Sequence, residues 1–462
     1  MKSLSLISAS HKEVVRISLP LVLSMGATTL MEFTDRIFLA RYSLDAIAAA
    51  VPSGFMVLLV MTFFLGTAGY ISVFIAHYIG SHRFDSVGKM LWQGIYFSLA
   101  ATVIFIGFSM LGPLIFDLMG HAPAIRSLES EYFRILCVFA GCDILGAVFS
   151  GFYIGQGRTR PVLLVTVLGM FVNIPLDYCL INGIWLFPEW GIRGAAVATG
   201  ISWAIIMLLL GVLVFLPQQV RHFSLLSTKQ LEAARLLRLV RVGFPNGLQF
   251  FLDIFAFTVF AAVVGHIGVQ ELAATNIVLN INAIAFMPLV GFSMGTSTLV
   301  GQALGAGCPQ KAQLMTRSSL HLAGMYTVLV AMVYLVFPGP LLGVFKPANL
   351  SFEAYAPVLG MSAELLYFVL GYLAFDVLTF VLAGTLKGAG DIAFIVYAHG
   401  AAAIVCMIVP LGVGVFWLGR GVYFAWTCVL CYSLFLSTAM TMRYRGGKWK
   451  KIRMAGDDNE IV

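Results

Sequence analysis

The stretch VPSGFMVLLVMTFFLGTAGYISVFIAHYIG, residues 51–80, contains no Asp, Glu, Lys or Arg. A helix needs about 20 mostly apolar residues to cross the hydrocarbon core of a bilayer, and about twelve stretches of this kind lie between Val14 and Met442. Hydrophobic residues make up 60% of the chain and charged residues only 11%, whereas soluble domains carry about 25% charged residues. The composition therefore predicts an all-α integral membrane protein and excludes a chain built from soluble domains.

The apolar stretches fall into two groups of six, separated by one long polar connection. We expect an N-terminal six-helix lobe at 1–216, a cytoplasmic linker at 217–241, a C-terminal six-helix lobe at 242–442 and a basic cytoplasmic tail at 443–462. The later part of the linker, TKQLEAARLLRLVRV, has leucines at helical spacing with basic residues between them, which is typical of a helix on the inner membrane surface. A plain linker is the alternative. The expected crossings are 14–40, 46–79, 88–119, 128–155, 160–182, 192–216, 242–266, 271–305, 312–345, 354–386, 392–418 and 421–442.

The two halves repeat one another in sequence. GTAGYISVFIAHYIG from Gly66 matches GFSMGTSTLVGQALG from Gly291, a shift of 225 residues (291 − 66). DILGAVFSGFYIGQG from Asp143 matches DVLTFVLAGTLKGAG from Asp376, a shift of 233 residues (376 − 143). Because six crossings per half is an even number, the halves share one orientation, and a pseudo-two-fold axis along the membrane normal would relate them. This is the parallel-repeat plan of transporters, in which the substrate site lies at the interface of the repeats.

The basic residues predict the orientation of the chain. With the amino terminus inside, most of the 28 Lys and Arg lie at the cytoplasmic ends of the crossings, as the positive-inside rule requires. We therefore expect a multi-pass protein of the cell inner membrane with both termini in the cytoplasm. The net charge of +7 follows from this placement, so it indicates contact with anionic lipid headgroups and not nucleic-acid binding.

Four polar residues of the first lobe form a candidate cation site. At about 1.5 Å of helix per residue, Asp35 and Asp177 lie roughly 28 and 25 Å above the inner surface. Asn173 is one turn below Asp177, and Thr199 lies in the same outer half of the membrane. A carboxylate in the hydrocarbon costs about 2.5–3.5 kcal/mol, so such a residue is functional by default. Two close carboxylates bind one proton with raised affinity, or one Na⁺ when both are ionised, and the residues leave the choice of ion open.

A second acidic group lies in the other lobe. Asp253 and Asp376 are both roughly 18 Å above the inner surface, near the midplane, and Tyr372 is one turn from Asp376. We expect these three residues to hold cargo or a second cation. Asp143, the repeat partner of Asp376, lies at a similar depth, and both a functional and a structural role are open for it. Because these deep ionisable groups are all acids, the pattern favours a cationic cargo.

With these residues in place, the chain resembles the multidrug and toxic compound extrusion (MATE) family over essentially its whole length. The matching motifs are MEFTDRIFLAR, NIPLDY, GIRGAAVAT, FPNGLQFFLD and GYLAFDVLTFVLAGTLKGAG. The resemblance implies that the four polar residues of the first lobe form a proton or sodium site and that the three of the second lobe form a further cation site. Family members often carry Glu where this chain has Asp253, so the carboxylate here has a shorter reach.

These observations predict a secondary active antiporter that exports drugs or small organic cations in exchange for inward H⁺ or Na⁺, by alternating access of the two lobes. Such a protein is not an enzyme and needs no cofactor besides the coupling ion, which if sodium would sit at Asp35 and Asp177. We expect a monomer in the lipid bilayer.

Three other classes are disfavoured by the sequence. A lipid-linked oligosaccharide flippase of similar helix plan would need Lys or Arg in its cavity for the pyrophosphate of its cargo. An intramembrane enzyme would need a nucleophile–base pair or a metal motif such as H-E-x-x-H, and the eight His show no such spacing. A channel is disfavoured by the two-lobe repeat.

Overall fold

A computed structural model of the protein describes residues 2–120, 122–184, 187–345, 352–452 and 454. These residues form helices joined by short loops, and twelve helical stretches are long and apolar enough to cross a membrane. The predicted all-α membrane class and the twelve crossings are therefore confirmed. Of the expected tail, α17 includes residues up to Arg445 and a 3₁₀ turn covers Lys448–Lys451, whereas 453 and 455–462 lie outside the described residues.

The chain divides into two compact units. We call Leu23–Leu248 with Gly301–Gly307 the N-terminal unit, and Gln249–Val300 with Cys308–Arg453 the C-terminal unit, to which residues 1–22 also belong. The first long helix of each half passes from one unit to the other, α1 after Val22 and α10 after Leu248. Each of these helices contains a proline just before that point, Pro20 or Pro245, which removes one backbone hydrogen bond from the helix.

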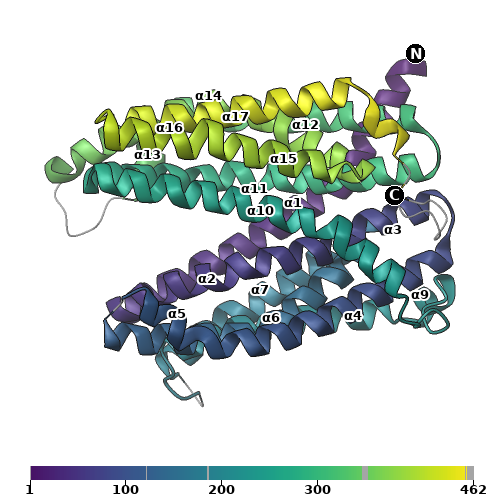
Figure 1. The fold of residues 1–462 in the computed structure, drawn as a ribbon, viewed down its shortest axis with the longest axis horizontal. Coiled ribbons are helices and arrows are strands. Elements are labelled where there is room, and N and C mark those ends of the chain that lie inside the picture. Colours follow the sequence, from purple (N-terminus) through teal and green to yellow (C-terminus); the bar gives the residue numbers. More distant parts are fainter. Residues whose placement is uncertain (1, 121, 185–186, 346–351, 453, 455–462) are drawn as a thin grey trace. The chain divides into compact units, whose positions relative to one another are not determined.

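The N-terminal unit is centred on α6, which packs against α2, α4 and α8. Figure 1 labels α2, α4 and α6. The helices of the first half are α1 (Lys2–Tyr42), α2 (Leu44–Gly69), α3 (Ile71–Gly80), α4 (Phe84–Phe108), α5 (Gly112–Leu118), α6 (Pro123–Gly155), α7 (Arg160–Asn182), α8 (Ile192–Val214) and α9 (Pro217–His222).

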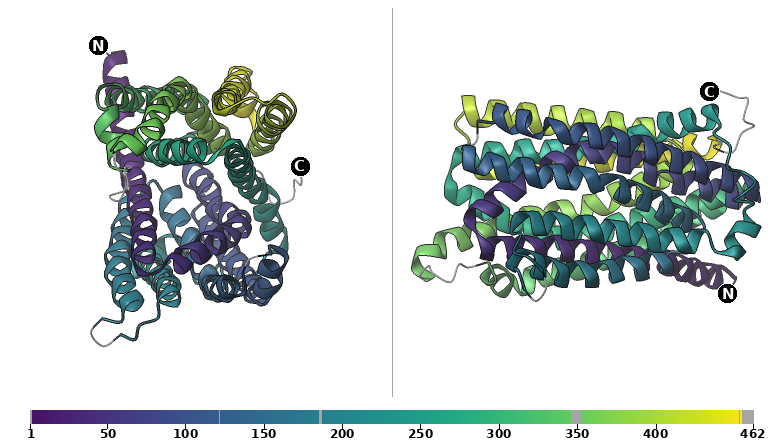
Figure 2. Two further views of the ribbon diagram at one scale, coloured as in Figure 1. Left: turned by 90° about the vertical axis from the view of Figure 1, so that its left-hand side faces the viewer. Right: turned by 90° about the horizontal axis from the view of Figure 1, so that it is seen from below.

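The C-terminal unit is centred on α14, which packs against α12 and α17. Figure 1 shows these three helices side by side, and the left view in Figure 2 shows many helices nearly end on. The helices of the second half are α10 (Ala233–Ile267), α11 (Val269–Gly305), α12 (Pro309–Val336), α13 (Pro338–Gly343), α14 (Phe352–Ala389), α15 (Ile392–Ala402), α16 (Val409–Leu411) and α17 (Val422–Arg445). Two π-helical turns, Ala403–Ile408 and Gly412–Trp417, flank α16 and its proline and complete the eleventh crossing.

The expected surface helix in the connection between the halves is a wrong prediction. Residues 233–241 are the first turns of α10, which continues without interruption into the seventh crossing. The sequence contains no Gly or Pro between Ala233 and Val242 that would end the helix. Within this segment Leu239 is fully buried against protein, whereas Leu237 is 67% exposed. Only residues before Ala233 remain as a connection.

A proline also shortens one other expected crossing. The ninth, expected to reach residue 345, ends at Val336 because Pro338 begins the separate helix α13. A proline fits the first turn of a helix but disrupts a helix interior, and this explains the break. The third keeps its expected extent, since Phe84–Leu118 is one span in which a 3₁₀ turn at Ser109–Leu111 joins α4 to α5.

The sequence repeat has a matching packing contact in each unit. A methyl group added at Gly155 would collide with the backbone oxygen of Ser72, and one at Gly388 would collide with that of Ser297. Gly155 and Gly388 are repeat partners at the shift of 233, and Ser72 and Ser297 are partners at the shift of 225. Each half has a G-x-x-x-G-x-G motif here, at Gly151, Gly155 and Gly157 or at Gly384, Gly388 and Gly390. The last glycine of the motif has a positive φ, 73° at Gly157 and 91° at Gly390, and follows the end of its helix. The two halves therefore fold alike at this point because equivalent glycines let equivalent backbones meet.

Candidate functional site

The first candidate site lies in the N-terminal unit, where α1, α7 and α8 bring together the residues predicted there. The hydroxyl of Thr199 donates a hydrogen bond of 3.2 Å to Oδ2 of Asp35. The carboxyl groups of Asp35 and Asp177 lie close enough to interact electrostatically. Asn173 and Asp177 are fully buried, and Asp35 is 9% exposed. Pro175 lies inside α7 between Asn173 and Asp177, so the helix lacks one backbone hydrogen bond near these polar side chains.

Five buried polar atoms of this group have no hydrogen-bond partner among the residues that the structure describes. They are Oδ1 of Asp35, both carboxyl oxygens of Asp177 and both amide atoms of Asn173. Each unsatisfied buried polar atom costs about 1–3 kcal/mol. Two carboxyl groups can hydrogen-bond to each other only when one of them carries a proton. The arrangement is thus suited to hold a shared proton, or a small cation bound by the carboxylate and amide oxygens.

An apolar layer covers this site on one side. Leu39 follows Asp35 by one turn, Ile181 follows Asp177 by one turn, and Ala195 precedes Thr199 by one turn. These three side chains belong to one buried cluster together with Ala46, Ala49, Ala50 and Ile192. Because Leu39, Ile181 and Ala195 lie on the same helices as the site residues, the cluster forms a layer one turn thick between the acids and the nearer ends of these helices.

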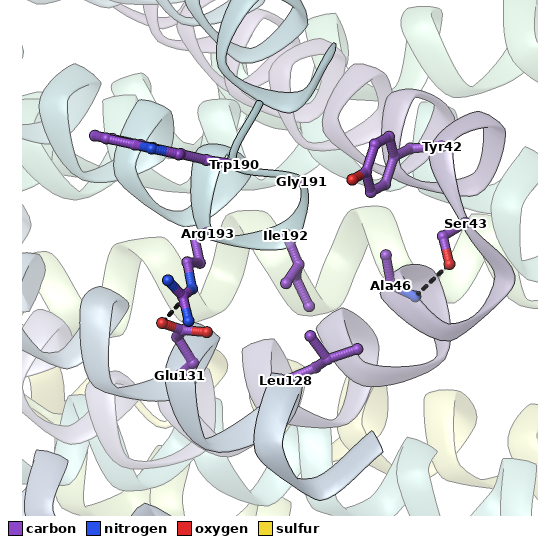
Figure 3. Close-up of a pocket in the computed structure, with 9 residues that line it drawn as sticks. All are labelled: Tyr42, Ser43, Ala46, Leu128, Glu131, Trp190, Gly191, Ile192 and Arg193. Carbon is purple, nitrogen blue, oxygen red and sulfur yellow. Dashed lines mark hydrogen bonds and ion pairs between the residues drawn. The ribbon is translucent and has the colours of Figure 1, made fainter. Parts of the chain in front are cut away.

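Beyond this layer the N-terminal unit contains a cavity of about 180 Å³. It is shown in Figure 3, where an ion pair between Arg193 and Glu131 crosses one side. Ala46 and Ile192 belong both to the cavity wall and to the apolar cluster. The remaining lining residues are Tyr42, Ser43, Leu128, Glu131, Trp190, Gly191 and Arg193. None of the four site residues lines the cavity, so the acids are separated from it by apolar side chains.

The second candidate site lies in the C-terminal unit, and α17 contacts both of its acids. Tyr432 donates a hydrogen bond of 2.8 Å to Oδ1 of Asp253, and the adjacent Ser433 donates one of 2.6 Å to Oδ1 of Asp376. Tyr372 is 3% exposed, and its hydroxyl has no partner within the described part of the chain. Asp253 itself is less enclosed, with 31% of its side chain exposed. The structure thus brings Asp253, Asp376 and Tyr372 into one region around α17.

Sequence reasoning missed several residues of this second site. Gln249 donates a hydrogen bond of 3.2 Å to Oδ2 of Asp253, and Nε2 of His399 lies 3.7 Å from Oδ1. Lys387 interacts electrostatically with Asp253, and its Nζ lies 4.8 Å from the ring centroid of Phe250. The expectation that all deep ionisable groups are acids was wrong, because His399 is buried inside a crossing helix. The sequence did contain a signal for His399, because this histidine lies in the apolar run IAFIVYAHGAA. An ionisable residue in such a run is a candidate functional residue.

Few side chains in the structure are grouped so that they could bind a metal ion. Among the described residues, no three His, Cys, Asp or Glu side chains come together as a metal site. A sodium ion at Asp35 and Asp177 would therefore depend on neutral oxygens as well, from Asn173 and Thr199. These hard oxygen ligands are of the type that Na⁺ and other hard cations prefer, so the residues present are compatible with sodium.

Twelve helices long and apolar enough to cross a membrane, a sequence repeat of six crossings and carboxyl groups inside crossing helices of both halves are typical of a membrane transporter. A family model described as MatE matches residues 20–179 and 245–411. The chain belongs to the MatE family, whose members are transporters and not enzymes. The two matched segments begin at the repeat partners Pro20 and Pro245, so the family model covers both halves in the same register.

Curated relatives match over most of their length. The chain is 26% identical over 448 residues to the probable multidrug resistance protein NorM of Thermotoga maritima, covering 96% of this chain and 93% of the relative. It is 28% identical over 387 residues to the multidrug resistance protein NorM of Burkholderia vietnamiensis, covering 82% of this chain and 81% of the relative.

Solved structures match in fold. One is described as an outward-facing conformation of a multidrug resistance MATE family transporter of the MOP superfamily, with a TM-score of 0.83, 20% identity and coverage of 98% of this chain and 99% of the other. Another is a MOP superfamily transporter from Pyrococcus furiosus, with a TM-score of 0.85, 21% identity and coverage of 96% and 97%. That protein is described as having a binding pocket of reversed polarity that suggests a different function.

Proposed function

We propose that this protein is a multidrug efflux antiporter of the inner membrane, which exports small organic cations in exchange for protons entering the cell. The observation that carries the proposal is the pair Asp35 and Asp177, two buried acids that interact electrostatically and have three oxygens without a hydrogen-bond partner among the described residues. The names of the NorM relatives support drugs as cargo. The alternating access of two lobes, with boundaries at 1–216 and 242–442, is part of the proposal.

The coupling step is a change in the occupancy of the first site. A proton shared between Asp35 and Asp177 neutralises one charge and supplies the missing hydrogen bond between the two acids. When the proton leaves, two carboxylates face each other in a buried environment, and their repulsion favours a different arrangement of α1 and α7. This change in α1 would be transmitted toward the cargo site, so that proton uptake and cargo release alternate.

A proton is the favoured coupling ion, and sodium is the alternative. Two close acids hold a proton without any further ligand, whereas Na⁺ needs a shell of several oxygens. Asn173 and Thr199 are the neutral residues of the site able to contribute to such a shell. The second site, with Asp253, Asp376 and Tyr372, would provide the negative charge that attracts the cargo.

Transport in proteoliposomes tests this function. Vesicles with an acidic interior are diluted into alkaline buffer containing a fluorescent organic cation, with the membrane potential clamped by valinomycin and equal K⁺. An antiporter accumulates the dye as protons leave, and a sodium gradient applied at equal pH tests the alternative ion. Dye accumulation that depends on neither gradient would refute ion-coupled antiport. Asp45→Asn, at an exposed acid in the first turn of α2, is a matched control.

The orientation is a separate proposal. The excess of Lys and Arg on one side places both termini and the connection Pro217–Glu232 in the cytoplasm. Reporter fusions after Gln218 and at the carboxyl terminus should both give a cytoplasmic signal, and a periplasmic signal from either fusion would contradict it. The expected monomer can be checked by the mass of the detergent-solubilised protein.

A further inference from the structure

A buried histidine in the C-terminal unit is not used by the coupling site described above. His399 lies in α15 and is 3% exposed. Its Nδ1 lies 2.7 Å from the backbone oxygen of Ile395. Because a carbonyl oxygen only accepts hydrogen bonds, Nδ1 must carry a hydrogen and donate it. In the neutral ring, the other nitrogen, Nε2, is then an acceptor.

The surroundings of Nε2 match a neutral histidine. The side-chain nitrogen of Gln249 lies 3.3 Å from Nε2 of His399 and 3.2 Å from Oδ2 of Asp253. One NH₂ group thus donates to both the imidazole and the carboxylate, and it holds them next to each other. The oxygen of the same amide, Oε1 of Gln249, is buried without a partner among the described residues. In this state the imidazole has no charge to pair with Asp253.

A proton on Nε2 would change the contacts of that nitrogen. The protonated ring would be positively charged, and Oδ1 of Asp253 lies 3.7 Å from Nε2, within ion-pair distance. The NH₂ group of Gln249 would then face another donor, so the amide would have to turn and present Oε1 to the ring. The imidazolium would neutralise Asp253 inside the protein. Protonation of His399 is therefore coupled to whether Asp253 has a charge available for a cation.

Other ionisable groups surround this pair. Lys387 of α14 interacts electrostatically with Asp253, and Tyr432 of α17 donates a hydrogen bond to it. Asp376 of α14 also interacts electrostatically with Asp253. Tyr372 of α14, near Asp376, and Cys406, in the π-helical turn after α15, complete the set. Among these groups, the imidazole is the one that has an acceptor nitrogen within ion-pair distance of Oδ1 of Asp253, so a proton added there places a positive charge beside the carboxylate.

We infer that His399 is a second proton-carrying residue of the transport cycle, and that its proton and a small organic cation compete for Asp253. With His399 protonated, Asp253 is paired internally and the cargo leaves. With His399 neutral, Asp253 is free to pair with the cargo, so each monovalent cation that binds releases one proton. This inference rests on the proposed function in that it takes Asp253 as part of the cargo site, and it assigns part of the proton-for-cation exchange to the cargo site itself.

Cation binding as a function of pH tests the inference. The full chain is purified in detergent with Asp35→Asn and Asp177→Asn, which removes the first site, and binding of the monovalent dye rhodamine 6G is measured between pH 5 and pH 9. In the range where His399 is protonated, the apparent Kd should rise about tenfold for each unit that the pH falls. His399→Gln should keep the tight binding of high pH at every pH. His266→Gln, at an exposed histidine of α10, should behave like the parent.

Two results would overturn it. One is a His399→Gln protein with the same pH dependence as the parent, and the other is loss of that dependence in Lys387→Gln but not in His399→Gln. The number of protons released per bound dye, from calorimetry in two buffers of different ionisation enthalpy, gives a measurement that needs no His399 variant. About one proton is expected, and none would overturn the inference. If the unmodified protein exports cations but binds them independently of pH, only this inference fails; if it neither binds nor exports cations, the proposed function fails too.

Discussion

Replacing Asp35 with asparagine separates proton coupling from folding. The amide has nearly the shape of the carboxyl group, and its oxygen can still accept the 3.2 Å hydrogen bond from Thr199. Its nitrogen can donate to Asp177, whose two oxygens have no partner among the described residues. We therefore expect stability to be unchanged or slightly raised, because the substitution satisfies an atom whose missing hydrogen bond costs about 1–3 kcal/mol. The site, however, can no longer share a proton between two acids.

The loss of transport can be estimated from the driving force. One pH unit corresponds to about 1.36 kcal/mol per proton, so a gradient of roughly two units supplies about 2.7 kcal/mol and supports a concentration ratio of roughly 100 when one proton is coupled. In Asp35→Asn the ratio reached through this site should fall toward 1, while dye binding at high pH stays within about twofold of the parent. Asp177→Asn should have the same effect. The assay is dye accumulation in proteoliposomes alongside equilibrium binding to the purified protein.

The refuting result is equally specific. Full accumulation by Asp35→Asn under a pH gradient and under a sodium gradient, at a normal level of folded protein, would remove the first site from the mechanism. Asp253, Asp376 and His399 would then be the remaining candidates for coupling. Loss of both accumulation and dye binding would instead indicate that Asp35 contributes to the cargo site or to the fold, which gel filtration and thermal unfolding would distinguish.

Further predictions concern stability and leak. Asp391, whose side chain is 6% exposed, pairs with Arg443 at 2.7 and 3.0 Å, so Asp391→Ala should destabilise the protein by about 3 kcal/mol in thermal unfolding, and Asp391→Asn by clearly less. Gly388→Val should lower the yield of folded protein sharply, because the new side chain would collide with the backbone of Ser297. Gly324→Val, at a position with open space around it, should leave the yield unchanged. Equal yields of the two variants would refute the close packing at Gly388. Leu39→Ser should raise proton leak without cargo, since it makes the apolar layer outside the acids polar; an unchanged leak rate would show that this layer is not the barrier.

The sequence by itself determined the class of protein and its plan. Crossing a bilayer depends on the length and polarity of single segments, so the twelve crossings can be read one at a time from residues such as 51–80. The repeat is likewise visible along the chain, and the structure adds that its partners Gly155 and Gly388 are both points of close backbone approach. The buried acids also stand out, because a carboxyl group in an apolar helix is costly wherever it lies.

Tertiary structure decided which of these groups meet. In a soluble helix the apolar stripe reveals the buried face, but in a membrane the faces toward lipid and toward protein are both apolar, and the rotation of each helix is weakly encoded. The meeting of Asp35, Asp177 and Thr199 from three helices could be proposed from depth alone, yet only the structure supplies the hydrogen bond. The partners of Asp253, Tyr432 and His399, were missed because depth says nothing about the direction in which a side chain points.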